Sequence, residues 1–222
     1  MPEDETRWRL IDRRIESTPS KLSSSDVYCY YYRDYVEGGY SASTSNQLVL
    51  NLKITAGVLA DNPSRSHYKD QALKQCVADY QLFFDGFTVR NTNVVVGIIP
   101  IPSSKPKNSP DCNDGMIRVA EQLEQYYPTL KFLDLFEVRH ETQPSHLGGT
   151  RSIEEIKDLL VLNNASLDRF SVVFLLDDMI TTGAHFVACR ELLQKKYPDL
   201  MIAGLFWAKK KPNPYTYYYY SV

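Results

Sequence analysis

The stretch Phe170–Phe186, FSVVFLLDDMITTGAHF, passes from an apolar run to two adjacent carboxylates and then to a short polar loop. An uninterrupted run of Val, Phe and Leu is typical of a strand that is buried on both faces of a parallel sheet. Asp177 and Asp178 end that run, and Thr181, Thr182 and Gly183 lead towards a helix that begins near His185. We therefore expect polar groups at the carboxyl end of a buried strand, where α/β proteins bind ligands.

Outward from this stretch, strand and helix patterns alternate along the chain. A short run rich in β-branched residues predicts a strand at 93–102, and further strands are expected at 131–139 and 201–208. Apolar residues at helical spacing predict helices at 67–84, 115–127, 152–162 and 184–197. Ser152 is expected to be an N-cap, with Glu155 completing a capping box. The segment 47–54 fits a strand and a short helix equally well.

This alternation predicts an α/β protein with a Rossmann-like parallel sheet that is flanked by helices. The 222 residues suit one sizeable domain with an extension. Residues 1–26 are polar and are expected to form an N-terminal arm or linker, so the domain is assigned to residues 27–222, with its core at about 46–208.

Composition and charge exclude several classes of function. A formal net charge of −2 gives no reason to expect nucleic acid as a partner through bulk electrostatics. The sequence contains no run of about 18 apolar residues and no apolar signal segment near Met1, so we expect no membrane association and a cytoplasmic location. The four cysteines are far apart and form no C-x-x-C pair, which argues against a zinc knuckle and against a disulfide framework.

The acidic pair and the loop after it offer complementary chemistry. Two carboxylates side by side suit the vicinal hydroxyls of a ribose or the shell of a magnesium ion. Two threonine hydroxyls, a glycine and the N–H groups of a helix start can hold a phosphate. A 5-phosphorylated ribose has both kinds of group. The alternative is that Asp177 or Asp178 only caps the helix and that the loop is an ordinary turn.

The segment LLDDMITTGAH (175–185) resembles the phosphoribosyl pyrophosphate (PRPP) signature of type I phosphoribosyltransferases (PRTases). The likeness extends over about residues 46–208, and within that family the spacing is distantly similar to ComF-like proteins. It implies the type I PRTase fold and a magnesium ion that is bound through PRPP, with no direct protein ligand. On this resemblance Asp177 and Asp178 hold the ribose hydroxyls, and the 5-phosphate lies against the residues Thr181, Thr182, Gly183, Ala184 and His185.

Two further loops carry expectations from the same resemblance. Ser103, Ser104 and Lys105 follow the strand predicted at 93–102 and stand where the family grips pyrophosphate. Arg139 begins the loop that corresponds to the family's mobile active-site loop, and we favour it as a catalytic contact. His140, His146 and Arg151 are further candidates in that loop.

Tyrosines gather near both ends of the chain, at 28–40 and at 215–220. They fit edge strands of the sheet, a small hood from 27–45 and 209–222 over a nucleotide base, or an interface for a homodimer or a protein partner. The expected function is the transfer of the 5-phosphoribosyl group from Mg–PRPP to a nitrogen nucleophile, with release of pyrophosphate. The alternative is a non-catalytic or partner-controlled subunit that binds a nucleotide or PRPP in the same pocket.

Overall fold

The computed structural model describes residues 7–13, 19–23, 28–90, 94–139 and 152–211. The main sheet has six strands, and all neighbours pair in parallel except β1, which is antiparallel to β2. In spatial order the strands are β1 (Arg9–Leu10), β2 (Cys29–Tyr35), β8 (Met201–Lys210), β7 (Val172–Ile180), β3 (Val96–Pro100) and β4 (Leu130–Phe132).

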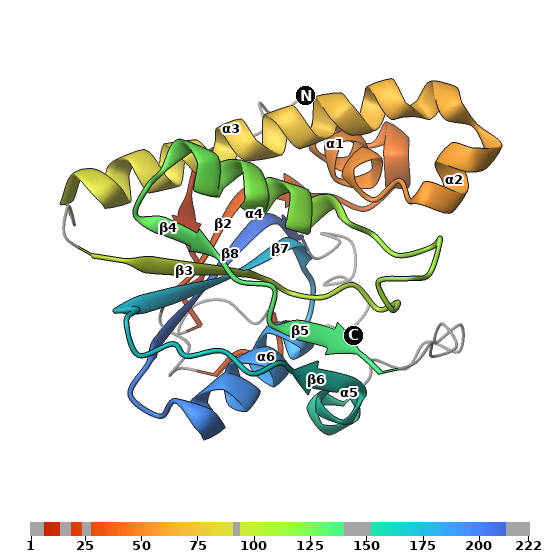
Figure 1. Ribbon diagram of the computed structural model, residues 1–222. Helices are drawn as coiled ribbons and strands as arrows, with labels where there is room; N and C mark the ends of the chain where they lie inside the picture. The colour runs from red at the N-terminus through yellow and green to blue at the C-terminus, as the bar shows by residue number, and fades with distance from the viewer. Residues whose placement is uncertain (1–6, 14–18, 24–27, 91–93, 140–151, 212–222) are drawn as a thin grey trace, which may run out of the picture.

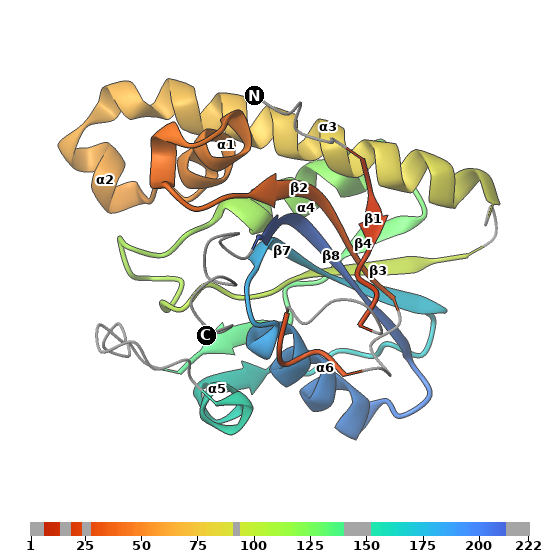
Figure 2. The same cartoon turned by 180° about the vertical axis from the view of Figure 1, so that it is seen from behind.

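Helices cover both faces of this sheet (Figures 1 and 2). One face carries α1 (Thr44–Leu52), α3 (Ser66–Arg90) and α4 (Gly115–Tyr126), with α2 (Ala56–Asp61) beyond α1. The other face carries α5 (Ile153–Leu159) and α6 (Ala184–Lys196), next to a separate two-stranded sheet of β5 (Phe136–Val138) and β6 (Leu160–Leu162). The expected fold class, a mostly parallel sheet flanked by helices, is confirmed.

The central strand β7 shows why its sequence is an unbroken apolar run. Val172, Phe174 and Leu176 pack into the core under α3 and α4, whereas Val173 and Leu175 pack into the core on the α5–α6 side. All five side chains are buried. Because successive side chains of a strand point to opposite faces, a strand covered on both sides needs an apolar residue at every position.

Three boundaries differ from the expectation. β7 does not stop at the acidic pair but continues to Ile180, so Asp177 and Asp178 lie within the strand. The segment 131–139 is not one strand, because β4 joins the main sheet whereas β5 pairs with β6. Residues 160–162 form β6 instead of the end of a helix, because they supply the backbone partners that β5 needs.

Other local predictions are confirmed. The Ser152 side chain accepts from the Glu155 N–H and the Glu155 side chain accepts from the Ser152 N–H, which is the expected capping box. The undecided segment 47–54 lies mostly in helix α1, whose first turn is capped by the Ser43 side chain.

The N-terminal segment assigned to an arm lies against the core where it is described. Arg9 and Leu10 pair with β2, and the Ile11 N–H donates to the Cys29 carbonyl over 2.8 Å. Ile11 and Leu22 are 2% and 3% exposed. The segment therefore adds apolar surface to the core on the α6 side of the sheet.

The first tyrosine run forms β2, one strand in from the edge of the sheet, so the expectation of an edge strand is wrong there. Tyr31 and Tyr32 are both buried, on opposite faces of the sheet. Trp8 packs against Tyr32, Tyr80 and Phe83 at ring-centroid distances of 5.4, 5.2 and 5.3 Å. The second tyrosine run, 215–220, lies outside the described residues.

A buried polar network stabilises this aromatic cluster. The Asp79 carboxylate accepts from Arg33 and from the Trp207 indole N–H, each over 2.7 Å.

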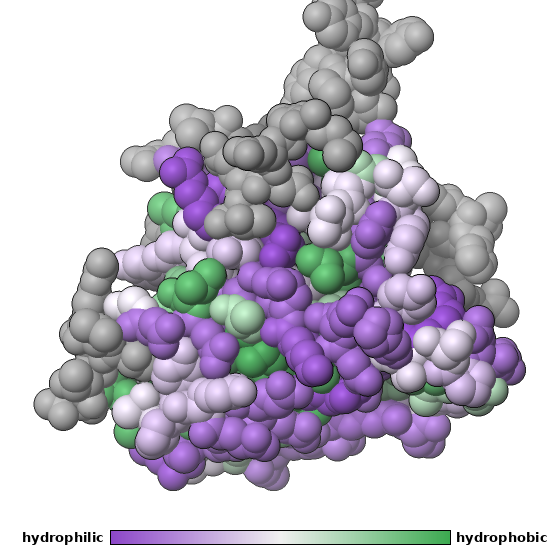
Figure 3. Space-filling view, turned by 90° about the horizontal axis from the view of Figure 1, so that it is seen from above, coloured by the Kyte–Doolittle hydropathy of each residue, from purple (hydrophilic) through white to green (hydrophobic). Residues whose placement is uncertain are grey.

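The outer surface of the helical layer that contains α3 is mostly hydrophilic, with small separate apolar patches (Figure 3). No helix in the described part of the chain combines the length and the hydropathy that a membrane span requires.

Candidate functional site

The acidic pair lies in the last four residues of β7, opposite the end of β8. The buried Tyr80 hydroxyl lies 3.1 Å from the Asp177 carbonyl oxygen and 3.0 Å from the Leu205 carbonyl oxygen, so it links the backbones of the two strands there. The Asp178 N–H donates to the Asp177 carboxylate over 2.9 Å. These contacts fix the strand end that carries both carboxylates.

Asp178 is buried, at 6% exposure, and each of its carboxylate oxygens has a partner. Lys53, just after α1, places its ammonium 2.9 Å from Oδ1. Asn113, just before α4, donates its side-chain N–H to Oδ2 over 3.2 Å. A buried carboxylate is costly unless it is paired and hydrogen-bonded, and these two residues meet that need.

Asp177 has a different electrostatic setting. Burial and the neighbouring charge of Asp178 raise its pKa from 3.8 to about 8, although Lys53 and the backbone N–H groups of Asp178 and Met179 act in the opposite direction. Burial alone lowers the pKa of Lys53, but the attraction of Asp178 raises it overall. Asp177, Asp178 and Lys53 together therefore carry less negative charge at neutral pH than two free carboxylates do.

The loop after β7 turns directly into α6. Gly183 is the N-cap, with φ at +83°, and the cap has no side-chain hydrogen bond. The alternative that Asp177 or Asp178 caps this helix is therefore wrong. The Thr182 hydroxyl accepts from the Ala184 N–H over 3.4 Å. A left-handed backbone at this turn suits glycine, the one residue without a Cβ.

The N-terminal segment forms one side of this loop. The Lys21 N–H donates to the Thr182 carbonyl over 2.8 Å. A Cβ on Gly183 would lie 3.0 Å from Leu22 Cδ2, so the backbone of the loop is in close contact with Leu22. Residues 19–23 therefore help to fix the conformation of the predicted phosphate loop.

A cavity of about 400 Å³ lies at the carboxyl ends of β7 and β3. This volume is within the range of about 300–1,000 Å³ that is usual for small-molecule sites. Seven of the residues predicted from the sequence line it: Asp177, Asp178, Thr181, His185, Ser103, Ser104 and Lys105. Thr182, Gly183 and Ala184 are not among the lining residues, although they form the turn behind Thr181.

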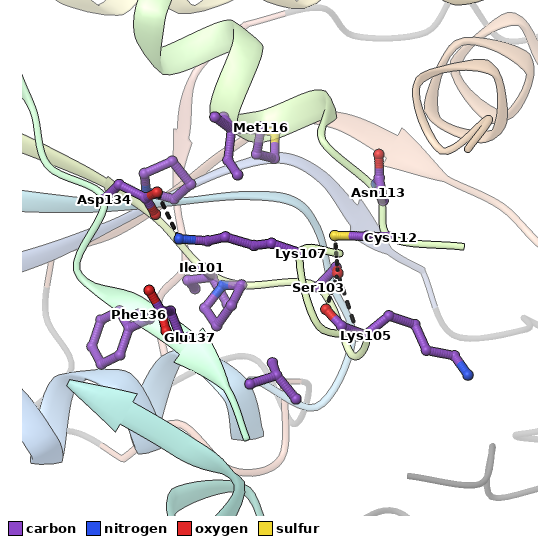
Figure 4. Close-up of a pocket in the computed structure, with 14 residues that line it drawn as sticks. Ile101, Ser103, Lys105, Lys107, Cys112, Asn113, Met116, Asp134, Phe136 and Glu137 are labelled. Atoms are coloured by element: carbon purple, nitrogen blue, oxygen red, sulfur yellow. Dashed lines mark hydrogen bonds and ion pairs between the residues drawn. The ribbon is translucent and has the colours of Figure 1, made fainter. Parts of the chain in front are cut away.

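The loop after β3 forms the second wall of the cavity. The Ser103 hydroxyl donates to the Lys105 carbonyl over 3.1 Å and lies 3.3 Å from the Cys112 sulfur. The Lys107 ammonium lies 2.6 Å from Asp134, whereas the Lys105 side chain extends away from that pair (Figure 4). The space beside Lys107, about 20 Å³, has room for no more than a water molecule.

Arg139 is not brought to the cavity. It is exposed directly after β5, and its N–H donates to the Leu159 carbonyl over 2.9 Å. Its strand, β5, belongs to the small sheet with β6, and the neighbouring Val138 lines the small space beside Lys107 together with Ser103 and Lys105. His140, His146 and Arg151 lie outside the described residues, so the predicted mobile loop stays a prediction.

Sequence reasoning missed four polar residues that line the cavity: Lys53, Thr55, Asp111 and Asn113. The buried Lys69 joins the two segments that carry them, because its ammonium contacts the Ile54 carbonyl over 2.6 Å and also the Asp114 carboxylate. α2 is also joined to the segment that carries Asp111 and Asn113, since the Gly57 N–H donates to the Pro110 carbonyl over 2.8 Å. The polar character of the loop 103–114 pointed towards Asp111 and Asn113 only, whereas no sequence signal pointed towards Lys53 and Thr55.

The site has no group of three or more His, Cys, Asp or Glu side chains that could hold a metal ion, within the residues that the structure describes.

Models of known protein families give no match to this chain, and a search of curated proteins gives none either.

Proposed function

We propose that this protein binds Mg–PRPP and transfers its 5-phosphoribosyl group to a nitrogen nucleophile, with release of pyrophosphate. The observation that carries the proposal is the shared cavity, in which the acidic pair of β7 meets the Ser103–Lys105 loop of β3. The acidic pair suits the hydroxyls of a sugar, and the loop before α6 suits its 5-phosphate. The Ser103–Lys105 loop suits a polyanionic leaving group.

The reaction needs little covalent chemistry from the protein. The bond from C1 of the ribose to the pyrophosphate oxygen breaks, and its electron pair leaves with pyrophosphate. The lone pair of the acceptor nitrogen forms the new bond to C1, and the proton of that nitrogen passes to solvent. Orientation of the two reactants and electrostatic stabilisation supply most of such an acceleration.

The residues of the cavity have separate roles in this mechanism. Asp178 accepts from a ribose hydroxyl, and Asp177 does so beside the carbon on which positive charge grows. That growing charge favours the ionised form of Asp177, because an opposite charge nearby lowers the pKa of a carboxyl group. Ser103, Ser104 and Lys105 donate to the leaving pyrophosphate. A magnesium ion bound with the substrate would supply neutralisation of part of the charge on the pyrophosphate, beside Ser103, Ser104 and Lys105.

A second candidate, binding of PRPP or a nucleotide without turnover, is favoured by one observation. Lys53 already neutralises Asp178, and the pKa of Asp177 is about 8, so the site offers a cationic transition state less negative charge than two ionised carboxylates. A regulatory subunit could use the same pocket in this form.

Incubation with PRPP, Mg²⁺ and a panel of purine, pyrimidine and other nitrogen-containing acceptors separates the two candidates. Pyrophosphate release that depends on one acceptor supports the transferase, whereas binding without release supports the regulatory subunit. The double variant Asp177→Asn, Asp178→Asn should abolish PRPP binding in calorimetry while the protein stays folded. Asp199→Asn, an exposed site at the other end of β8, is the matched control. Unchanged affinity in the double variant would reject both candidates.

A further inference from the structure

Lys53 brings a positive charge to the acidic pair from the helical layer above the sheet. Its ammonium lies 2.9 Å from Asp178 Oδ1, and its side chain is 36% exposed to the cavity that Ser103 and Lys105 also line. Lys53 therefore lines the same cavity as Asp177 and Asp178, which are proposed to bind the ribose, and Ser103 and Lys105, which are proposed to bind the pyrophosphate.

The backbone around Lys53 is fixed, so that a change of partner requires only its side chain to move. The Lys53 N–H bonds to the carbonyls of Val49 and Asn51 at the end of α1. The next residue, Ile54, donates its N–H to the Asn51 carbonyl over 3.2 Å, and its own carbonyl accepts from the buried Lys69. Four carbon–carbon bonds of the lysine stem remain free to carry the ammonium across the cavity.

A sugar hydroxyl and Lys53 share the same acceptor. One oxygen of Asp178 is bonded to Lys53 and the other to Asn113. Each carboxylate oxygen has a second lone pair, so a ribose hydroxyl can donate there as well, and because it draws on the same negative charge it weakens the attraction between Asp178 and the ammonium. Displacing the ammonium leaves a cation in a partly enclosed site, which is unfavourable unless an anion takes the place of the carboxylate. The 5-phosphate of the sugar is directed to the loop before α6, whereas a diphosphate on C1 is directed to the wall formed by Ser103 and Lys105.

We propose that Lys53 is a specificity-determining residue, which exchanges Asp178 for the C1 diphosphate and thereby selects PRPP over ribose 5-phosphate. This inference rests on the proposed binding of PRPP. Ribose 5-phosphate weakens the ion pair and offers no second partner at C1. PRPP weakens the same pair and supplies several negative charges close to the ammonium.

The test is calorimetric titration of the full chain with PRPP and, separately, with ribose 5-phosphate, both with Mg²⁺. In Lys53→Met the preference for PRPP over ribose 5-phosphate should fall about tenfold, the size of one charge-assisted hydrogen bond. PRPP should bind more weakly, and ribose 5-phosphate should bind as tightly as before or more tightly. Lys74→Met, at an exposed position on α3, should keep the wild-type preference.

Lys53→Gln serves as a second neutral variant, because its amide can still donate to Asp178 and so protects the fold if methionine destabilises it. A preference that is unchanged or increased in the neutral variants overturns the role of Lys53, while PRPP binding by the wild type leaves the proposed function standing. If the wild type binds neither sugar, both proposals fail. Equal weakening of both ligands also overturns the inference, since it indicates a contact that does not distinguish them.

Discussion

Replacing Asp177 with asparagine should stabilise the protein at alkaline pH, because the folded site disfavours the ionised form that this carboxyl group adopts there. Its pKa is raised from 3.8 to about 8 by burial and by the charge of Asp178. The folded state therefore binds the proton more tightly than the unfolded chain does. This contribution to stability is complete below pH 3.8 and is lost as the pH rises through about 8. Asparagine keeps an oxygen that can accept from the Asp178 N–H, and it carries no charge to lose.

The magnitude follows from the two pKa values. They differ by about 4, and each pKa unit corresponds to about 1.4 kcal/mol, which gives a ceiling of about 6 kcal/mol. Asp177 is only half-buried and borders an open cavity, where water screens its charge. We therefore expect a gain of about 2–3 kcal/mol for Asp177→Asn at pH 9 relative to wild type, and almost none near pH 4.

Urea unfolding of both proteins at several pH values between 4 and 9 measures this difference. Asp199→Asn, which removes an exposed carboxylate, should change stability by less than about 0.5 kcal/mol throughout. A difference between Asp177→Asn and wild type that stays constant from pH 4 to pH 9 would refute the reasoning. The stabilised variant is also expected to lose affinity for PRPP, as a trade of function for stability predicts.

Two further predictions concern the fold around the site. Gly183→Ala should destabilise the protein by about 1–2 kcal/mol in urea unfolding, because φ is +83° there and the new Cβ meets Leu22. Gly86→Ala, in α3 with no atom within 4 Å of the new Cβ, should instead stabilise it by about 0.5–1 kcal/mol, and equal effects of the two changes would contradict the account. Asp79→Ala should cost about 3–5 kcal/mol, because it leaves Arg33 and the Trp207 N–H buried without their carboxylate. A loss below about 1 kcal/mol in the same assay would show that water or a neighbouring group replaces that carboxylate.

The sequence by itself determined the elements of the site that depend on local pattern. The unbroken apolar run of β7 predicts a strand covered on both faces, and the capping box at Ser152 predicts a helix start, because both signals lie within a few consecutive residues. The alternation of strands and helices then predicts a parallel sheet, and a parallel sheet collects the ends of β3 and β7 at one edge. The resemblance of 175–185 to the PRPP signature, added to that geometry, points to seven of the residues that line the cavity.

Only the tertiary structure decided which residues complete the cavity. Lys53 follows α1 and Asn113 lies 65 residues before Asp178, so no local pattern links either of them to the acidic pair. Their positions depend on how α1 and α4 pack on the sheet and on Lys69, which joins the two segments. The same holds for the contact of Leu22 with Gly183, and for the pairing of β5 with β6, which joins residues more than 20 positions apart. Packing between distant segments depends on shape and burial over the whole core, and this information is not contained in any short stretch of the chain.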